Sequence, residues 1–172
     1  MSKRNSVLLL VVFYLNVIGL YACSSNSDRG ARSVDALMLV YFNALSAKDV
    51  EAFNQLLPSV DLSWGVYNDA DRADEKEFRS KAKAKRQGIE EAFRRHAEEF
   101  GGVKISVTGL ETEPLQQLNV VWSAEPYGKL GGAIVTVTRE GKSYKYIFSN
   151  IMQYRGKYYL EELPFVDIKR WE

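Results

Sequence analysis

The chain has 172 residues, with 23 Lys and Arg against 22 Asp and Glu, and one cysteine. This balance of charge gives no long-range attraction to nucleic acid, so we expect no nucleic-acid partner. A single cysteine also excludes a disulfide within the chain.

The N-terminal segment has the order of a secretory signal peptide. Lys3 and Arg4 precede an apolar run from Val7 to Ala22 that is interrupted by Asn16. As a helix, these 16 residues would rise about 24 Å, which is less than the roughly 30 Å hydrocarbon core of a bilayer. The pattern therefore favours a signal peptide over residues 1–22 rather than a transmembrane anchor.

The segment that ends the apolar run, Leu20-Tyr21-Ala22-Cys23, resembles the lipobox of bacterial lipoprotein precursors, although Tyr21 is bulkier than usual. The resemblance implies that Cys23 carries lipid as the first residue of the mature protein and binds it to a membrane. It also implies, through Ser24 and the lack of an acidic tract, an outer-membrane anchor facing the periplasm. The alternative for Cys23 is a buried free thiol.

Three parts of the chain follow from this interpretation. Residues 1–22 are the lipoprotein signal peptide, residues 23–32 are the lipidated cysteine with a flexible, Ser-rich tether, and residues 33–172 form a single domain. Losing Lys3 and Arg4 leaves 21 basic residues against 22 acidic ones. The mature chain of 150 residues suits one domain with a sizeable core.

The folded part begins with a predicted pair of helices. Apolar residues recur at intervals of three and four between Ser33 and Ser46, and a second helix is expected from the N-cap Asp49 to Pro58. Val60–Trp64 suggests a short strand.

Residues 71–100 are rich in charge and in helix-forming residues, with an apolar stripe along one side. A straight helix of this length would rise about 45 Å, more than a domain of this size covers comfortably. We therefore expect a kink or break at Gly88 and an end at Gly101.

After residue 102, β-branched and aromatic residues alternate with polar ones, which predicts strands. Glu140-Gly141 and Arg155-Gly156 are expected to form tight hairpin turns, so the strands beside them pair antiparallel. The expected strands are Val103–Glu111, Asn119–Glu125, Gly132–Arg139, Lys142–Tyr154 and Lys157–Leu163.

Helices followed by antiparallel strands predict an α+β fold with the helices on one face of the sheet. The paired helices within Ala36–Phe53 and the late strands around Thr138–Lys142 and Tyr154–Leu160 resemble the cone-shaped, cystatin-like superfamily of nuclear transport factor 2, ketosteroid isomerase and the polyketide cyclases. The resemblance implies a curved antiparallel sheet around a conical pocket for a small apolar molecule. It also implies, as in many members, a homodimer formed through the outer face of the sheet.

No segment matches the catalytic residues of that superfamily, so the resemblance assigns no catalytic residue. His96, the one histidine, lies near the predicted apolar stripe, where we expect a boundary residue with a hydrogen-bonded ring rather than a base. With one histidine and one lipidated cysteine, neither a zinc nor a copper site is expected. The acidic segment 68–74 lacks the central glycine and terminal glutamate of a calcium loop, which favours a polar turn. No cofactor is predicted.

A basic run at 79–86 invites a phosphate-binding interpretation. Lys81, Lys83 and Lys85 do not share one helical face, and nine cations between residues 71 and 100 are opposed by eight acids. A solvated helix surface is the simpler interpretation.

Aromatic residues supply the candidate ligand-binding positions. In Lys142–Tyr154 one face carries tyrosines and the other is partly apolar, so either core packing or an interface accounts for them. The proposed pocket-lining residues are Trp64, Tyr67, Trp122, Tyr144 and Tyr146.

These observations predict an envelope-anchored lipoprotein that acts as a non-catalytic module binding a small ligand or an envelope protein. A small pocket enzyme of the isomerase or cyclase type stays open as the alternative, because fold alone does not separate the two.

Overall fold

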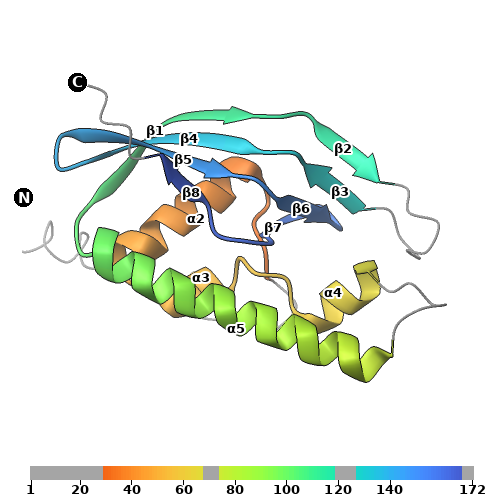
Figure 1. The fold of residues 1–172 in the computed structure, drawn as a ribbon. Coiled ribbons are helices and arrows are strands. Elements are labelled where there is room, and N and C mark those ends of the chain that lie inside the picture. The colour runs from red at the N-terminus through yellow and green to blue at the C-terminus, as the bar shows by residue number, and fades with distance from the viewer. Residues whose placement is uncertain (1–28, 68–73, 119–126, 168–172) are drawn as a thin grey trace, which may run out of the picture.

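The computed structural model describes residues 29–67, 74–118 and 127–167. Within these residues the helices come first and the strands follow, so the predicted α+β class is confirmed (Figure 1). The helices are α2 (Val34–Ala47), α3 (Val50–Asn54), α4 (Val60–Tyr67) and α5 (Glu75–Phe100). The strands are β1 (Ile105–Thr112), β2 (Leu115–Leu118), β3 (Tyr127–Leu130), β4 (Ala133–Arg139), β5 (Lys142–Phe148), β6 (Ile151–Tyr154), β7 (Lys157–Leu160) and β8 (Phe165–Asp167).

The opening helix pair is confirmed together with its predicted cap. The Ser33 hydroxyl accepts a hydrogen bond from the backbone N–H of Ala36 at 3.1 Å and begins α2. Lys48 ends α2 in the left-handed region, at φ 56°, and the Asp49 carboxylate then accepts from the N–H of Ala52 at 2.9 Å. Each side chain satisfies a backbone donor that the first turn of a helix leaves free.

The chain ahead of α2 is already attached to the domain. Gly30 donates its backbone N–H to the Gln55 carbonyl at 2.8 Å, and Ala31 forms a β-bridge with Tyr158. Gly30 has a φ of +84°, and a Cβ there would lie 2.6 Å from the Tyr159 ring. Only glycine fits this position, because the conformation and the contact both exclude a side chain.

The predicted strand at Val60–Trp64 is wrong, because these residues begin helix α4. The Ser59 hydroxyl accepts a hydrogen bond from the backbone N–H of Leu62 at 3.0 Å, and Asp61 lies in the first helical turn. The Trp64 ring packs on Phe78 of α5, with ring centroids 5.2 Å apart. The N-terminal cap and this contact with α5 outweigh the strand-like composition of the segment.

The predicted break at Gly88 is also wrong, because α5 runs without interruption through 26 residues. Ion pairs four residues apart line its polar side, including Glu75–Arg79 at 2.7 Å and Glu90–Arg94 at 2.6 Å. Figure 1 shows that α4 accompanies the half of α5 that extends past α3. Helix α4 therefore covers the part of α5 that extends beyond the core.

We expect Gly88→Ala to stabilise the protein by about 0.5–1 kcal/mol, because alanine loses less backbone entropy than glycine when a helix forms. An added Cβ at Gly88 would have no atom within 4 Å. Urea unfolding followed by circular dichroism measures the change. Gly141→Ala is the control: its position is equally open, but its φ of +75° should make alanine destabilising. Equal effects of the two substitutions would contradict the prediction.

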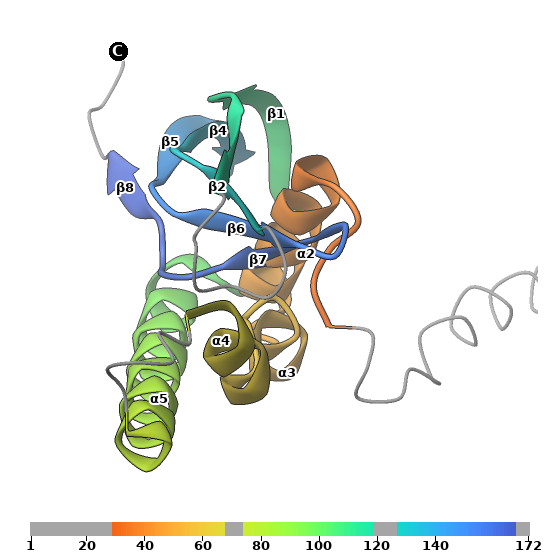
Figure 2. The same cartoon turned by 90° about the vertical axis from the view of Figure 1, so that its right-hand side faces the viewer.

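The strands form two antiparallel sheets with the orders β1-β4-β5-β8 and β2-β3-β6-β7. Breaks of two residues at 113–114, 131–132 and 149–150 carry the chain from one sheet to the other. Viewed from the side, α3, α4 and α5 lie together on one side of the strands (Figure 2). The expected single curved sheet is thus replaced here by two sheets of four strands.

The predicted long strand Lys142–Tyr154 is wrong in one respect, because it divides into β5 and β6 at Ser149 and Asn150. The Asn150 side-chain amide donates to the Glu162 carboxylate at 2.6 Å, and the backbone carbonyl of Asn150 accepts from the N–H of Glu161 at 3.3 Å. These bonds tie the break to the segment after β7. The last predicted strand is likewise shorter, since β7 ends at Leu160.

Both predicted hairpin turns are confirmed. The φ angles are 51° and 75° at Glu140 and Gly141, and 49° and 71° at Arg155 and Gly156. Two consecutive positive φ angles are typical of the tight turn that matches the twist of paired strands. The predicted strand Asn119–Glu125 lies wholly outside the described residues, whereas β2, β3 and β8 were not predicted.

An aromatic cluster forms the centre of the core. Phe53 of α3 and Phe93 of α5 stack with their ring centroids 3.9 Å apart, and Tyr41 of α2 meets both rings edge-on. Phe148 of β5 contacts Tyr41 from the sheet side at 5.2 Å. The cluster therefore joins the helices and the β1-β4-β5-β8 sheet in one core.

Candidate functional site: a groove between α4 and α5

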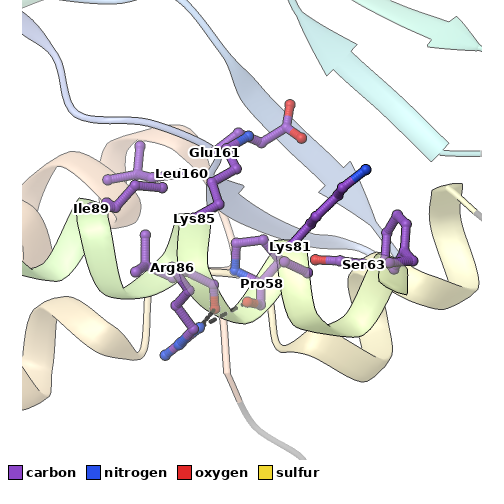
Figure 3. Close-up of a pocket in the computed structure, with 11 residues that line it drawn as sticks. Pro58, Ser63, Lys81, Lys85, Arg86, Ile89, Leu160 and Glu161 are labelled. Carbon is purple, nitrogen blue, oxygen red and sulfur yellow. Dashed lines mark hydrogen bonds between the residues drawn. The ribbon is translucent and has the colours of Figure 1, made fainter. Parts of the chain in front are cut away.

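A groove of about 370 Å³ opens between α4, α5 and the segment after β7 (Figure 3). We call it the α4–α5 groove. Its volume falls within the usual range for small-molecule sites, roughly 300–1,000 Å³. The apolar lining residues are Leu57, Pro58, Phe78, Ala82, Ile89 and Leu160, and the polar ones are Ser63, Lys81, Lys85, Arg86 and Glu161.

The wall formed by α5 follows from the spacing of its residues. Phe78, Ala82 and Ile89 are separated by four and seven residues, so they lie on one side of the helix. Further along the same helix, Phe93, Ala97 and Phe100 are buried in the core. The apolar stripe of α5 thus contributes to the core over its C-terminal half and to the groove over its N-terminal half.

Helix α4 is fixed against α5 by a charged contact as well as by Trp64. Arg79 donates to the Asp61 carboxylate at 2.5 Å and to the Glu75 carboxylate at 2.7 Å. The hydrogen bond with Asp61, followed by that with Glu75, raises the pKa of Arg79. One arginine therefore joins the two helices beside the groove.

The opposite wall is held by Arg86. Its guanidinium donates to the carbonyls of Asn54 at 2.8 Å, Pro58 at 2.8 Å and Leu57 at 3.2 Å. Burial lowers the pKa of Arg86, and the charge of Arg29 lowers it further. The guanidinium of Arg86 therefore donates hydrogen bonds to carbonyl groups at and after the end of α3, and the apolar part of its side chain lies at the groove.

Two lysines and one glutamate define the mouth of the groove. In Figure 3, Lys81 and Lys85 both extend from α5 toward the strands, where Glu161 lies. Lys81 pairs with the Glu77 carboxylate at 2.5 Å, and both side chains of that pair are largely exposed. Lys85 forms no ion pair with any residue in the described part of the chain.

The basic run 79–86 is therefore not only a solvated helix surface, because part of it lines the groove. Lys81, Lys83 and Lys85 do not share one face, as expected, but Lys81 and Lys85 are four residues apart and both line the groove. Lys83 is exposed and does not line the groove.

The structure separates the aromatic residues that the sequence singled out. Trp64 lies on α4 against Phe78, so it is next to the groove without lining it. Tyr146 is 1% exposed in the core, and Tyr144 is half-buried on the same face of β5. The side chain of Tyr67, together with Trp122 and Cys23, lies outside the described residues.

The sequence named Lys81 and Lys85 within the basic run, but it did not predict the groove or its apolar residues. Leu57 and Pro58 are far from Leu160 and Glu161 in the chain, and only the fold brings them together. The repeat of Phe78, Ala82 and Ile89 was the available signal, as part of the apolar stripe predicted along this helix.

Four buried side-chain atoms have no hydrogen-bond partner among the described residues: the Tyr41 hydroxyl, Asn54 Oδ1, His96 Nε2 and Arg139 Nε. The His96 ring lies 4.7 Å from that of Phe100 and 5.7 Å from that of Tyr146. Burial lowers the pKa of His96 to about 4. The expectation of a boundary residue near the stripe is confirmed, but the expected hydrogen bond is missing at Nε2.

The outer face of one sheet carries a short apolar row. Ile134 of β4 pairs with Ile147 of β5, which pairs in turn with Phe165 of β8, and all three side chains are exposed. Phe165 is the most exposed, at 67%.

Over the described ranges, no helix is long and apolar enough to cross a membrane, and no three His, Cys, Asp or Glu side chains are grouped to hold a metal ion. Comparison of the chain with family models, with curated proteins and with solved structures gives no match.

Proposed function

We propose that this protein is an envelope-anchored lipoprotein acting as a non-catalytic binding module, with the α4–α5 groove as its site for a small, largely apolar molecule. The observation that carries the proposal is the groove itself, whose walls are mainly apolar and whose mouth holds Lys81, Lys85 and Glu161 (Figure 3). Apolar walls with a few polar groups are typical of sites that bind small molecules.

The chemistry of the lining residues supports binding over catalysis. A general acid or base works best when its pKa lies near neutral pH. The one histidine of the chain is packed between Phe100 and Tyr146 and is not among the lining residues. Glu161 is the carboxylate that lines the groove, so the isomerase or cyclase alternative would depend on it.

The anchor accounts for the position of such a module. Residues 24–28 separate Cys23 from Arg29, the first described residue. Fully extended, this segment spans roughly 20 Å. A lipid on Cys23 would therefore keep the groove near the membrane, where apolar molecules concentrate. The cone-shaped superfamily stays part of this proposal, supported by the order of helices and antiparallel strands.

Filling the groove tests the proposal. We expect residues 24–172, which contain every described element, to bind the neutral apolar fluorophore N-phenyl-1-naphthylamine. We expect Ala82→Trp to weaken this binding at least tenfold, because the indole would occupy the space between Phe78 and Ile89. A fluorescence titration measures both affinities.

The matched control is Ala84→Trp, which places the same indole on an exposed position of α5 outside the groove. Equal binding by the two variants would contradict the groove as the site. Native mass spectrometry of the same protein adds two readings. A retained molecule that is chemically altered on incubation favours the enzyme, and a dimer favours docking through the row of Ile134, Ile147 and Phe165.

A further inference from the structure

From the shape and charge of the α4–α5 groove, we infer that its ligand is a single-chain anionic amphiphile whose head lies at Lys81 and Lys85. This inference rests on the proposed function and specifies the ligand class. It commits to one chemistry: an unbranched apolar chain that ends in a carboxylate or a phosphate.

The shape of the groove favours an elongated ligand. Its α5 wall extends from Phe78 to Ile89, which corresponds to about 16 Å along the helix axis. Apolar side chains line the groove along this wall, and Ala82 is the small residue between Phe78 and Ile89. An apolar wall of this length fits an extended acyl chain better than a compact ring system.

The charge at the mouth favours an anionic head. Lys81 and Lys85 are one helical turn apart and extend to the same side of α5 (Figure 3). Among the residues that the structure describes, Lys85 has no carboxylate partner, and the pair of Lys81 with Glu77 is exposed to solvent. Exposed pairs of this kind contribute little, so Lys81 can exchange its partner for a ligand at small cost.

The rim also contains groups that limit this attraction. Glu161 lies at the same mouth and repels an anion. The guanidinium of Arg86 is already hydrogen-bonded to three carbonyls. Among the lining residues at the mouth, the two lysines therefore face one carboxylate (Figure 3). The net charge of these lining residues is positive, so a carboxylate or phosphate gains an electrostatic attraction there that a hydroxyl does not.

Competition with the bound fluorophore tests the inference. The probes are dodecanoate, a dodecyl-chain lysophosphatidylglycerol and dodecanol, each used below the concentration at which it forms micelles. We expect each anion to displace N-phenyl-1-naphthylamine at a concentration at least fivefold lower than dodecanol does. The order of the two anions identifies the head as a carboxylate or a phosphate.

The double variant Lys81→Glu with Lys85→Glu should abolish the preference for the anions over dodecanol, when each displacement is expressed relative to the variant's own affinity for the fluorophore. The control is Lys76→Glu with Lys83→Glu, which changes the net charge equally on exposed positions of α5 outside the groove and should keep the preference. Equal displacement by dodecanol and both anions would overturn the inference while leaving the proposed function intact. Failure of the unmodified protein to bind the fluorophore would instead overturn the proposed function.

Discussion

Cys23→Ser should eliminate fatty-acid attachment to the full-length chain. The lipobox-like segment ends at the one cysteine of the sequence, directly after an apolar run that is too short to span a bilayer as a helix. Attachment requires the sulfur nucleophile of that residue, and the neighbouring serines do not replace it. The effect is therefore expected to be complete rather than graded.

The measurement is incorporation of labelled fatty acid in a bacterial host that expresses residues 1–172, followed by the intact mass of the detergent-extracted protein. The unmodified chain should lose residues 1–22 and gain acyl groups, whereas Cys23→Ser should gain none. Ser24→Ala is the control and should be acylated like the unmodified chain. Equal labelling of Cys23→Ser would sink the lipoprotein interpretation and favour the free thiol.

The anchor would also set the physical conditions under which the groove works. Because Gly30 and Ala31 are bonded to Gln55 and Tyr158, a lipid on Cys23 would be separated from the domain only by the short stretch between Cys23 and Arg29. A ligand that partitions into the membrane is then present near the groove at a higher local concentration than in bulk solution. The localisation and the ligand class proposed above thus support each other.

The features that the sequence predicted well are those governed by local chemistry. Asp49 caps a helix as predicted, and each predicted hairpin turn is marked by a glycine that adopts a positive φ. In each case the determining interaction involves residues within a few positions of one another. Pattern and structure therefore agree there.

The errors arose where distant residues decide the local structure. Val60–Trp64 is stabilised as a helix by Phe78 of α5, which packs on Trp64, in addition to the local cap at Ser59. The division between β5 and β6 depends on bonds from Asn150 to a segment eleven or twelve residues later. No periodicity within the segment itself contains that information.

The groove illustrates the same limit for function. The stripe of α5 was visible in the sequence, but whether its N-terminal half meets the core or solvent depends on where Leu57 and Leu160 lie. Tyr144 and Tyr146 were chosen as ligand-binding residues because they are aromatic and alternate on a strand. In the fold, that alternation directs Tyr146 into the core against Phe42, with ring centroids 4.9 Å apart.

Arg86→Met should destabilise the protein by about 2–3 kcal/mol, because a charged guanidinium that serves several carbonyls is lost. The carbonyls of Asn54, Leu57 and Pro58 accept its hydrogen bonds. A short helix leaves its last carbonyls without partners inside the helix, and a cation near that end also interacts favourably with the helix dipole. Methionine keeps the apolar stem, so the loss reports mainly on the guanidinium.

Thermal unfolding followed by circular dichroism should show a decrease in midpoint of roughly 5–10 °C for a domain of this size. Arg86→Lys should recover less than half of the loss, since an ammonium lacks the planar fork that reaches three acceptors. The matched control is Arg94→Met on the same helix. Arg94 pairs with Glu90 on an exposed face, so its removal should cost less than about 0.5 kcal/mol. A midpoint for Arg86→Met within 1 °C of that for Arg94→Met, an interval set by roughly 0.3 kcal/mol, would contradict the role assigned to the guanidinium.

Because Arg86 also lines the groove, the Arg86→Met variant should bind the fluorophore more weakly even at temperatures where it remains folded.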